Sequence, residues 1–279
     1  MCTLILFRQP GHEWPVLLAA NRDELRSRPA RPPGPHWPDR PGVVAGLDLQ
    51  AGGSWLGLNR HGLIAAVLDR RGSLGPAPGK RSRGELVLEA LDHTDAASAS
   101  RALATIDPLA YRPFNLLLAD ARDAFVLCHE GLGCPRRLAL PPGLTMLTAG
   151  DPDDPLCPRI AHFRPRFARA PLPDPDRGDW RAWRALLADR SSPTGDPRDA
   201  LCIRTAGEYG TVSSALIALR RDPSRPAVWL FADGPPDEAA FHPIALSAAT
   251  AMAGARADAS LPPRAPENDF PMRWEGSTA

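Results

Sequence analysis

The chain has 279 residues and 43% of them are hydrophobic, so it is long enough to bury a substantial core. Lysine and arginine number 33 against 32 for aspartate and glutamate, and the formal net charge of +1 excludes bulk electrostatic binding to nucleic acid. No run approaches the roughly 20 apolar residues of a membrane-spanning helix, so we expect no membrane insertion. The five cysteines are an odd number without the spacing of a disulfide framework, which favours a reducing compartment and a cytoplasmic location.

Short apolar runs joined by short polar or glycine-containing loops dominate the N-terminal quarter of the chain. This pattern is typical of antiparallel hairpins. The expected strands are residues 3–7, 15–20, 43–47, 54–58 and 63–68. The proline-rich segment 28–41 interrupts them, and we expect it to be irregular and exposed.

Helical patterns follow, and then further hairpins. Ser82-Arg83-Gly84-Glu85 has the spacing of a capping box ahead of an apolar run, which predicts a helix start. The other expected helices are 96–106, 158–168 and 180–187, and the other expected strands are 114–119, 124–128, 144–148, 211–219 and 227–231. This order favours a single α+β domain over residues 1–245 rather than a parallel α/β fold. Residues 246–279 are rich in alanine, proline and charge and are expected to form a weakly ordered tail.

Cys2 is the first candidate functional residue because it directly follows Met1. Methionine aminopeptidase would expose its thiol together with a free α-amino group, so a nucleophile and its general base would lie within one residue. An α-amine titrates near about 8 and a thiol near about 8.5, so a modest shift of either pKa would activate the pair at neutral pH. The alternative is a buried, inert cysteine that opens an ordinary strand.

Asn21-Arg22-Asp23-Glu24 is the second candidate feature. If the first two strands form a hairpin, the loop expected after Ala20 returns beside the start of the chain. Arg22 would then favour a thiolate on Cys2 through its positive charge, and Asp23 would orient the α-amine. The alternative is a polar turn with solvated charges.

Several segments together resemble one family. They are Met1-Cys-Thr-Leu-Ile5, Leu18-Ala-Ala-Asn-Arg-Asp-Glu-Leu25, Ala45-Gly-Leu-Asp48, Gly52-Gly-Ser-Trp-Leu-Gly57, Gly62-Leu-Ile-Ala-Ala66, Ser82-Arg-Gly-Glu-Leu86, Phe114-Asn-Leu116 and Gly210-Thr-Val-Ser-Ser214. The set is similar to the NRDE family, named for its Asn-Arg-Asp-Glu signature, which includes the transport and Golgi organisation protein 2 group. The matches run in order over roughly residues 1 to 234.

The resemblance implies a four-layer αββα sandwich of antiparallel sheets, like that of N-terminal-nucleophile hydrolases such as penicillin V acylase and bile-salt hydrolase. Those enzymes use a terminal cysteine with a nearby arginine and aspartate, which carries over to Cys2, Arg22 and Asp23. They also use two asparagines, and here Asp69 and Gly150 stand near those positions. An anionic Asp69 would not donate to a developing oxyanion.

Other residues complete the predicted site. The paired glycines before Ser54 and Trp55 suit a close backbone approach to a ligand, with a hairpin turn and a core tryptophan as the alternative. Arg204 could face the cleft or have a structural role. The predicted catalytic residues are Cys2, Arg22 and Asp23, and the predicted ligand-binding residues are Asn21, Gly53, Ser54, Trp55, Asp69 and Arg204.

Two functions follow from these observations. The first is a Cys2-dependent amidohydrolase that acts on a small non-peptide C–N bond and requires no cofactor. The second is a carrier that binds a small molecule in the same cleft, with haem as the bound ligand that the family association implies. No Cys-x-x-Cys or His-Glu-x-x-His spacing occurs, so no metal site is predicted. The substrate and the oligomeric state stay open.

Overall fold

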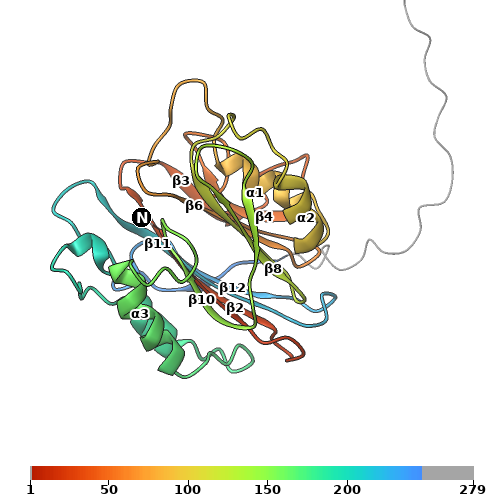
Figure 1. Ribbon diagram of the computed structural model, residues 1–279. Helices are drawn as coiled ribbons and strands as arrows, with labels where there is room; N and C mark the ends of the chain where they lie inside the picture. Colours follow the sequence, from red (N-terminus) through yellow and green to blue (C-terminus); the bar gives the residue numbers. More distant parts are fainter. Residues whose placement is uncertain (1, 247–279) are drawn as a thin grey trace, which may run out of the picture.

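Two antiparallel sheets packed face to face form the centre of the computed structural model, which describes residues 2–246 (Figure 1). The first sheet has the strand order β10 (Gly143–Leu147), β1 (Thr3–Arg8), β2 (Val16–Leu25), β11 (Tyr209–Leu219), β12 (Val228–Ala232) and β13 (His242–Pro243). The second has the order β3 (Ala30–Gly34), β4 (Val43–Asp48), β5 (Leu56–Asn59), β6 (Ile64–Asp69), β7 (Phe114–Ala119), β8 (Ala124–His129) and β9 (Arg136–Ala139).

Helices cover the outer face of each sheet. α1 (Gly84–Leu91) and α2 (Ala96–Leu103) pack on the second sheet, and α3 (Pro158–Arg169) and α4 (Arg181–Leu187) pack on the first (Figure 1). A short 3₁₀ helix, Pro197–Asp199, precedes β11. The layers are therefore α, β, β and α, which confirms the predicted α+β sandwich. Within residues 2–246 no helix is both long and apolar enough to cross a membrane.

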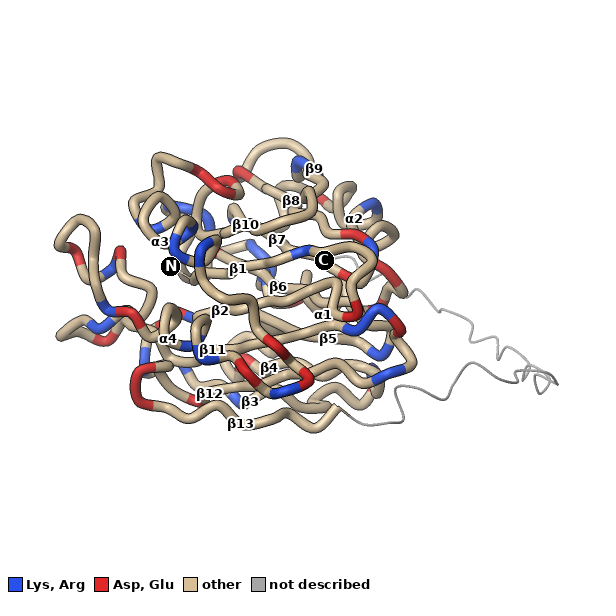
Figure 2. Tube along the Cα trace, turned by 90° about the horizontal axis from the view of Figure 1, so that it is seen from below, with Lys and Arg blue, Asp and Glu red and all other residues tan. Residues whose placement is uncertain are grey.

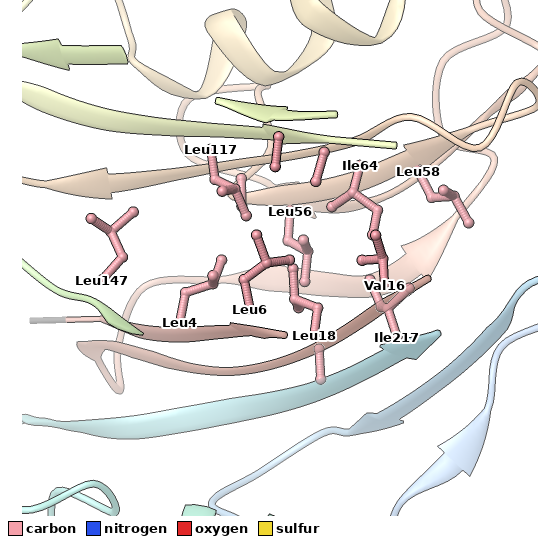
Figure 3. Packing of buried hydrophobic residues seen from close by; sticks show 14 of the residues in the cluster. Leu4, Leu6, Val16, Leu18, Leu56, Leu58, Ile64, Leu117, Leu147 and Ile217 are labelled. Atoms are coloured by element: carbon pink, nitrogen blue, oxygen red, sulfur yellow. The ribbon is translucent and has the colours of Figure 1, made fainter. Parts of the chain in front are cut away.

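The core between the sheets is formed by alternate side chains of the strands. Successive strand residues point to opposite faces, so every second side chain meets the facing sheet. Leu4, Leu6 and Leu18 of the first sheet approach Leu56 and Ile64 of the second, and all five side chains are buried (Figure 3). Charged residues gather mainly at loops and strand ends (Figure 2).

The largest difference from the sequence prediction concerns β2. The predicted strand ended at Ala20, but β2 continues to Leu25, so the Asn-Arg-Asp-Glu segment is a strand and not a turn. The reason lies far along the chain, because β11 pairs with β2 from Tyr209 opposite Leu25 to Leu219 opposite Val16. Hydrogen bonds from β11 hold these polar residues extended despite their turn-like composition.

Two other elements also differ. The segment 28–41, predicted to be irregular, contains β3 at the edge of the second sheet, where proline is tolerated because one side of the strand needs no ladder partner. β9, at the other edge, was not predicted, since it is short, begins with two arginines and is largely exposed. The predicted tail lies outside the described residues except for Leu246.

Gly53 and Gly84 provide a test of how tightly β5 is joined to α1. The Ser54 amide donates to the Gly84 carbonyl at 3.0 Å, and a Cβ at Gly53 would lie 2.5 Å from the Gly84 carbonyl carbon. We expect Gly53→Ala to lower the free energy of unfolding by about 1–3 kcal/mol in urea titrations. Gly207→Ala is the control, because a Cβ there meets nothing within 4 Å. Equal unfolding midpoints for the two variants would contradict the close approach.

Candidate functional site

A cleft of about 230 Å³ opens where strands of the two sheets end. The cleft is lined by Cys2 just before β1, Trp55 just before β5 and Asp69 at the end of β6. The segment 75–84, which leads into α1, contributes much of the remaining wall. The cleft therefore joins the predicted nucleophile to residues from both sheets.

Cys2 and Arg22 lie on the face of the first sheet that looks toward the second. They continue the rows of Leu4 and Leu6 on β1 and of Leu18 on β2, which pack between the sheets. The Arg22 guanidinium carbon lies 4.1 Å from the centroid of the Trp55 ring, and Arg22 is only 8% exposed. Burial lowers the pKa of Arg22, although the nearby Cys2 sulfur opposes this shift.

Asp23 lies on the opposite face of the same strand, toward α3. Its carboxylate accepts hydrogen bonds from Thr211 Oγ1 at 2.7 Å and from Arg159 at 3.3 Å. The Asp23 and Arg159 side chains are 0% and 2% exposed, so this ion pair is fully enclosed. Burial raises the pKa of Asp23, while the positive charges of the α-amino group and Arg159 oppose the rise.

Arg159 was not predicted from the sequence, although a signal was present. It lies at helical spacing from Phe163 and Phe167 on the buried side of α3, where an arginine is unusual without a carboxylate partner. Arg159 also donates to Thr3 Oγ1 at 2.6 Å. One guanidinium thus joins α3 to β1 and β2 directly behind the cleft.

The backbone of Asp23, and not its side chain, contacts the thiol. The Asp23 amide donates to Cys2 Sγ at 3.4 Å, and the thiol lies 3.7 Å from the Asp23 carbonyl oxygen. Burial raises the pKa of the Cys2 thiol to about 11, and the charge of Asp23 adds to the rise. The environment therefore shifts this pKa upward, opposite to the activation near neutral pH expected from the sequence.

The Asn21 side chain points to the same face of β2 as Asp23 and is hydrogen-bonded to the segments that cover this face. Its amide nitrogen donates to the carbonyl oxygens of Leu187 and Leu201 at 3.0 and 2.9 Å, and its oxygen accepts from Ser214 at 2.6 Å. All three partners are buried with it. The side-chain amide of Asn21 is consequently committed to structural contacts and not directed at a ligand.

Ser54 and Asp69 both line the cleft, and each has a hydrogen-bond or ion-pair partner in the protein. The Ser54 hydroxyl donates to the Leu56 carbonyl at 3.1 Å. Gly53 is buried beside it and is not among the residues that line the cleft. Asp69 forms an ion pair with Arg83 at 2.7 Å. Burial raises the pKa of Asp69, and Arg83 opposes the rise. Arg83 offsets much of the negative charge that the sequence alone placed in the site.

The structure does not bring Arg204 or Gly150 to the cleft. Arg204 forms ion pairs with Asp237 at 3.0 Å and with Glu238, which matches its structural alternative. The Gly150 carbonyl accepts from Asn115 at 2.6 Å, outside the residues that line the cleft. Neither residue supplies a donor beside Cys2.

The layer order α, β, β, α is that of an N-terminal-nucleophile hydrolase-like fold. A solved structure, the Caenorhabditis elegans N-acylethanolamine-hydrolyzing acid amidase orthologue, aligns with a TM-score of 0.53 at 13% identity. The alignment covers 81% of this chain and 94% of that one. At this identity the likeness shows the fold alone.

The family follows from the sequence comparison. The model of the family described as Transport and Golgi organisation 2 matches residues 1–226, so the chain belongs to this family. The Mus musculus Transport and Golgi organization 2 homolog is 35% identical over 137 residues, which is 46% of this chain and 48% of the relative. The Homo sapiens homolog is 36% identical over 137 residues, which again is 46% of this chain and 48% of the relative. The chain thus spans about half the length of the curated relatives it matches.

The thiol environment predicts a pH profile. With a Cys2 pKa of about 11, about one thiol in ten thousand is ionised at pH 7, and this fraction rises about tenfold per pH unit. We expect the iodoacetamide alkylation rate of a Met1-containing chain to rise through pH 10 without a plateau. A Cys134→Ser background removes the exposed thiol Cys134. A plateau near pH 9, as for a free thiol, would contradict the enclosed environment.

The enclosed ion pair predicts a stability effect. Arg159→Met leaves the buried Asp23 carboxylate without its guanidinium, and we expect the free energy of unfolding to fall by about 3–5 kcal/mol in urea titrations. Arg169→Met, at an exposed position of the same helix, is the matched control and should change it by less than about 0.5 kcal/mol. Equal losses for both variants would show that the pair does not hold α3 to the sheet.

Proposed function

We propose that the chain is an N-terminal cysteine amidohydrolase that cuts a small, non-peptide amide bond. The observation that carries this proposal is the placement of Cys2 beside the buried cation Arg22 in the cleft between the sheets. The fold supports it, because a solved structure of the same fold is an N-acylethanolamine-hydrolyzing acid amidase orthologue. A purely structural cysteine would need neither an adjoining cleft nor a buried guanidinium beside it.

Activation of the thiol requires a proton acceptor. A thiol with a pKa of about 11 is almost fully protonated at neutral pH, so the neighbouring charges alone do not make it a nucleophile. Removal of Met1 would place a free α-amine, whose ordinary pKa is about 8, on Cys2 itself. In the proposed step this amine takes the thiol proton as the sulfur attacks.

The proposed reaction consists of two acyl transfers, the first to Cys2 and the second to water. Cys2 Sγ attacks the amide carbonyl carbon, the C–N bond breaks, and the leaving amine takes the proton that the α-amine had accepted. A thioester on Cys2 remains. Water then attacks the thioester carbon, the C–S bond breaks, and the acid product leaves as the thiol regains its proton.

Arg22 is proposed to stabilise the negative charge that develops in both steps. Its guanidinium is buried, and a charge in such surroundings acts more strongly than in water. It would take the part that asparagine amides play in the related enzymes, since Asp69 and Gly150 offer no such donor. The ion pair between Asp69 and Arg83 limits repulsion of the oxyanion.

Asp23 is proposed to orient the α-amine. The positive charge of the Met1 α-amino group is among those that act on this carboxylate, and the amine freed on Cys2 would lie one residue further along the chain. The backbone of Asp23 at the same time fixes the thiol. Such a free, reactive thiol would function in a reducing compartment, which is consistent with a place in the cytoplasm.

The acylation step can be tested with 4-nitrophenyl acetate. Intact-mass analysis should show loss of Met1 and an acetyl group on Cys2 after brief exposure at pH 7. We expect Cys2→Ala to lower the release of 4-nitrophenol at least about a hundredfold, because the nucleophile is removed. Arg22→Gln should lower the acylation rate by about 10²–10³ through loss of the stabilising charge.

Cys134→Ser is the control, because this exposed cysteine lies outside the cleft. It should acylate at the wild-type rate. Retention of Met1 on the purified, reactive protein would overturn the terminal-amine mechanism. Acylation of the Cys2→Ala variant at the wild-type rate would overturn the role of Cys2.

Haem carriage in the same cleft is the alternative that the family resemblance implies. Iron in haem is held by histidine, cysteine, methionine or tyrosine side chains, and of these types only Cys2 lines the cleft within residues 2–246. The cleft of about 230 Å³ is also smaller than the about 300–1,000 Å³ of typical cofactor pockets. The described residues therefore do not fit the macrocycle, and we assign no step to haem.

A further inference from the structure

The cleft contains more positive than negative side chains. The cations that line it are Arg22, Arg28, Lys80, Arg81, Arg83 and Arg112. The acids are Asp23, Glu24, Asp48 and Asp69. The carboxylate of Asp23 is on the far face of β2, paired with Arg159, so it does not neutralise the cleft.

The three remaining acids are already paired. Arg28 contacts Asp48 at 2.6 Å and Glu24 at 3.7 Å. Arg83 contacts Asp69 at 2.7 Å. Arg81, which also lines the cleft, forms ion pairs with Glu85 and Glu89, each at 2.6 Å.

Three cations of the cleft have no carboxylate partner within residues 2–246: Arg22, Lys80 and Arg112. Lys80 donates to the Leu109 carbonyl at 2.5 Å. Arg112 donates to four loop carbonyls, those of Gly72, Leu74, Gly75 and Pro76, at 3.0, 2.9, 3.1 and 3.2 Å, so the partners of both cations are neutral oxygens. Arg22 is stacked on Trp55 and is only 8% exposed. A cation buried without an anion is costly, so the cleft is suited to a ligand that brings negative charge.

A second, apolar cavity adjoins the charged one. It has a volume of about 30 Å³ and shares Cys2, Arg22 and Trp55 with the cleft. Beyond these its walls include Leu56 and Phe231, from opposite sheets. Cys2 thus lies where an apolar space, large enough for a short acyl group only, meets a positively charged one.

We propose that the substrates are N-acyl amino acids with a short acyl chain, a class that rests on the proposed amidohydrolase function. The acyl group would enter the apolar cavity, its carbonyl carbon would lie at Cys2 Sγ, and the carboxylate of the amine portion would lie among Arg22, Lys80 and Arg112. The sulfur takes the acyl group, the C–N bond breaks, and the amino acid leaves with the transferred proton. Water then releases the short carboxylic acid from the thioester.

Binding to the Cys2→Ala variant tests this charge selection without turnover. Isothermal titration should show that N-acetyl-L-alanine binds at least about tenfold more tightly than its uncharged methyl ester, and that added sodium chloride weakens only the former. Lys80→Gln in this background should reduce the preference several-fold. Arg101→Gln, on the exposed side of α2, is the charge-matched control and should leave it unchanged.

Each outcome bears on one of the two proposals. Equal binding of acid and ester, binding of neither, or an undiminished preference in Lys80→Gln would overturn the substrate class. Acylation of Cys2 by 4-nitrophenyl acetate would still support the hydrolase in that case. A clear preference for the acid without such acylation would support anion selection by the cleft and overturn the hydrolase.

Discussion

The pairing of β2 between β1 and β11 is the constraint on which the cleft depends. Pairing with β11 keeps the whole Asn-Arg-Asp-Glu segment extended, while β1 pairs only with its first residue, Asn21. An extended strand sends neighbouring side chains to opposite faces. Arg22 consequently enters the space between the sheets, and Asp23 enters the layer of α3. Neighbouring residues of β2 thus place a cation in the cleft and an anion in the core behind it.

The two charges have different surroundings. Asp23 meets Arg159 and Thr211 inside the protein, so its charge is balanced by the fold itself. Arg22 meets the face of Trp55 and the cleft, so its charge is available to a reacting group or a ligand. The same burial raises the pKa of the Cys2 thiol. Chemistry at Cys2 therefore depends on a proton acceptor and not on a thiolate present at rest.

Most elements were predictable because they are encoded locally. The strands 114–119 and 124–128 lie within one residue of the observed bounds of β7 and β8, since apolar runs beside a short turn specify a hairpin. Prediction failed where distant pairing overrides local composition, as for β2 and for the proline-containing β3. Both roles of Arg204 stayed open for a related reason, because its partner Asp237 is 33 residues away and leaves no local signal.

The sequence by itself determined the α+β class, the order of hairpins and helices, and the candidate nucleophile Cys2, because these depend on neighbouring residues and periodicity. Tertiary structure decided which charges reach the cleft and in which direction its pKa values shift. These properties depend on burial and on contacts such as Asp23 with Arg159, which are 136 residues apart. A charge has a defined effect only once its distance to other charges and to water is set, and folding sets both.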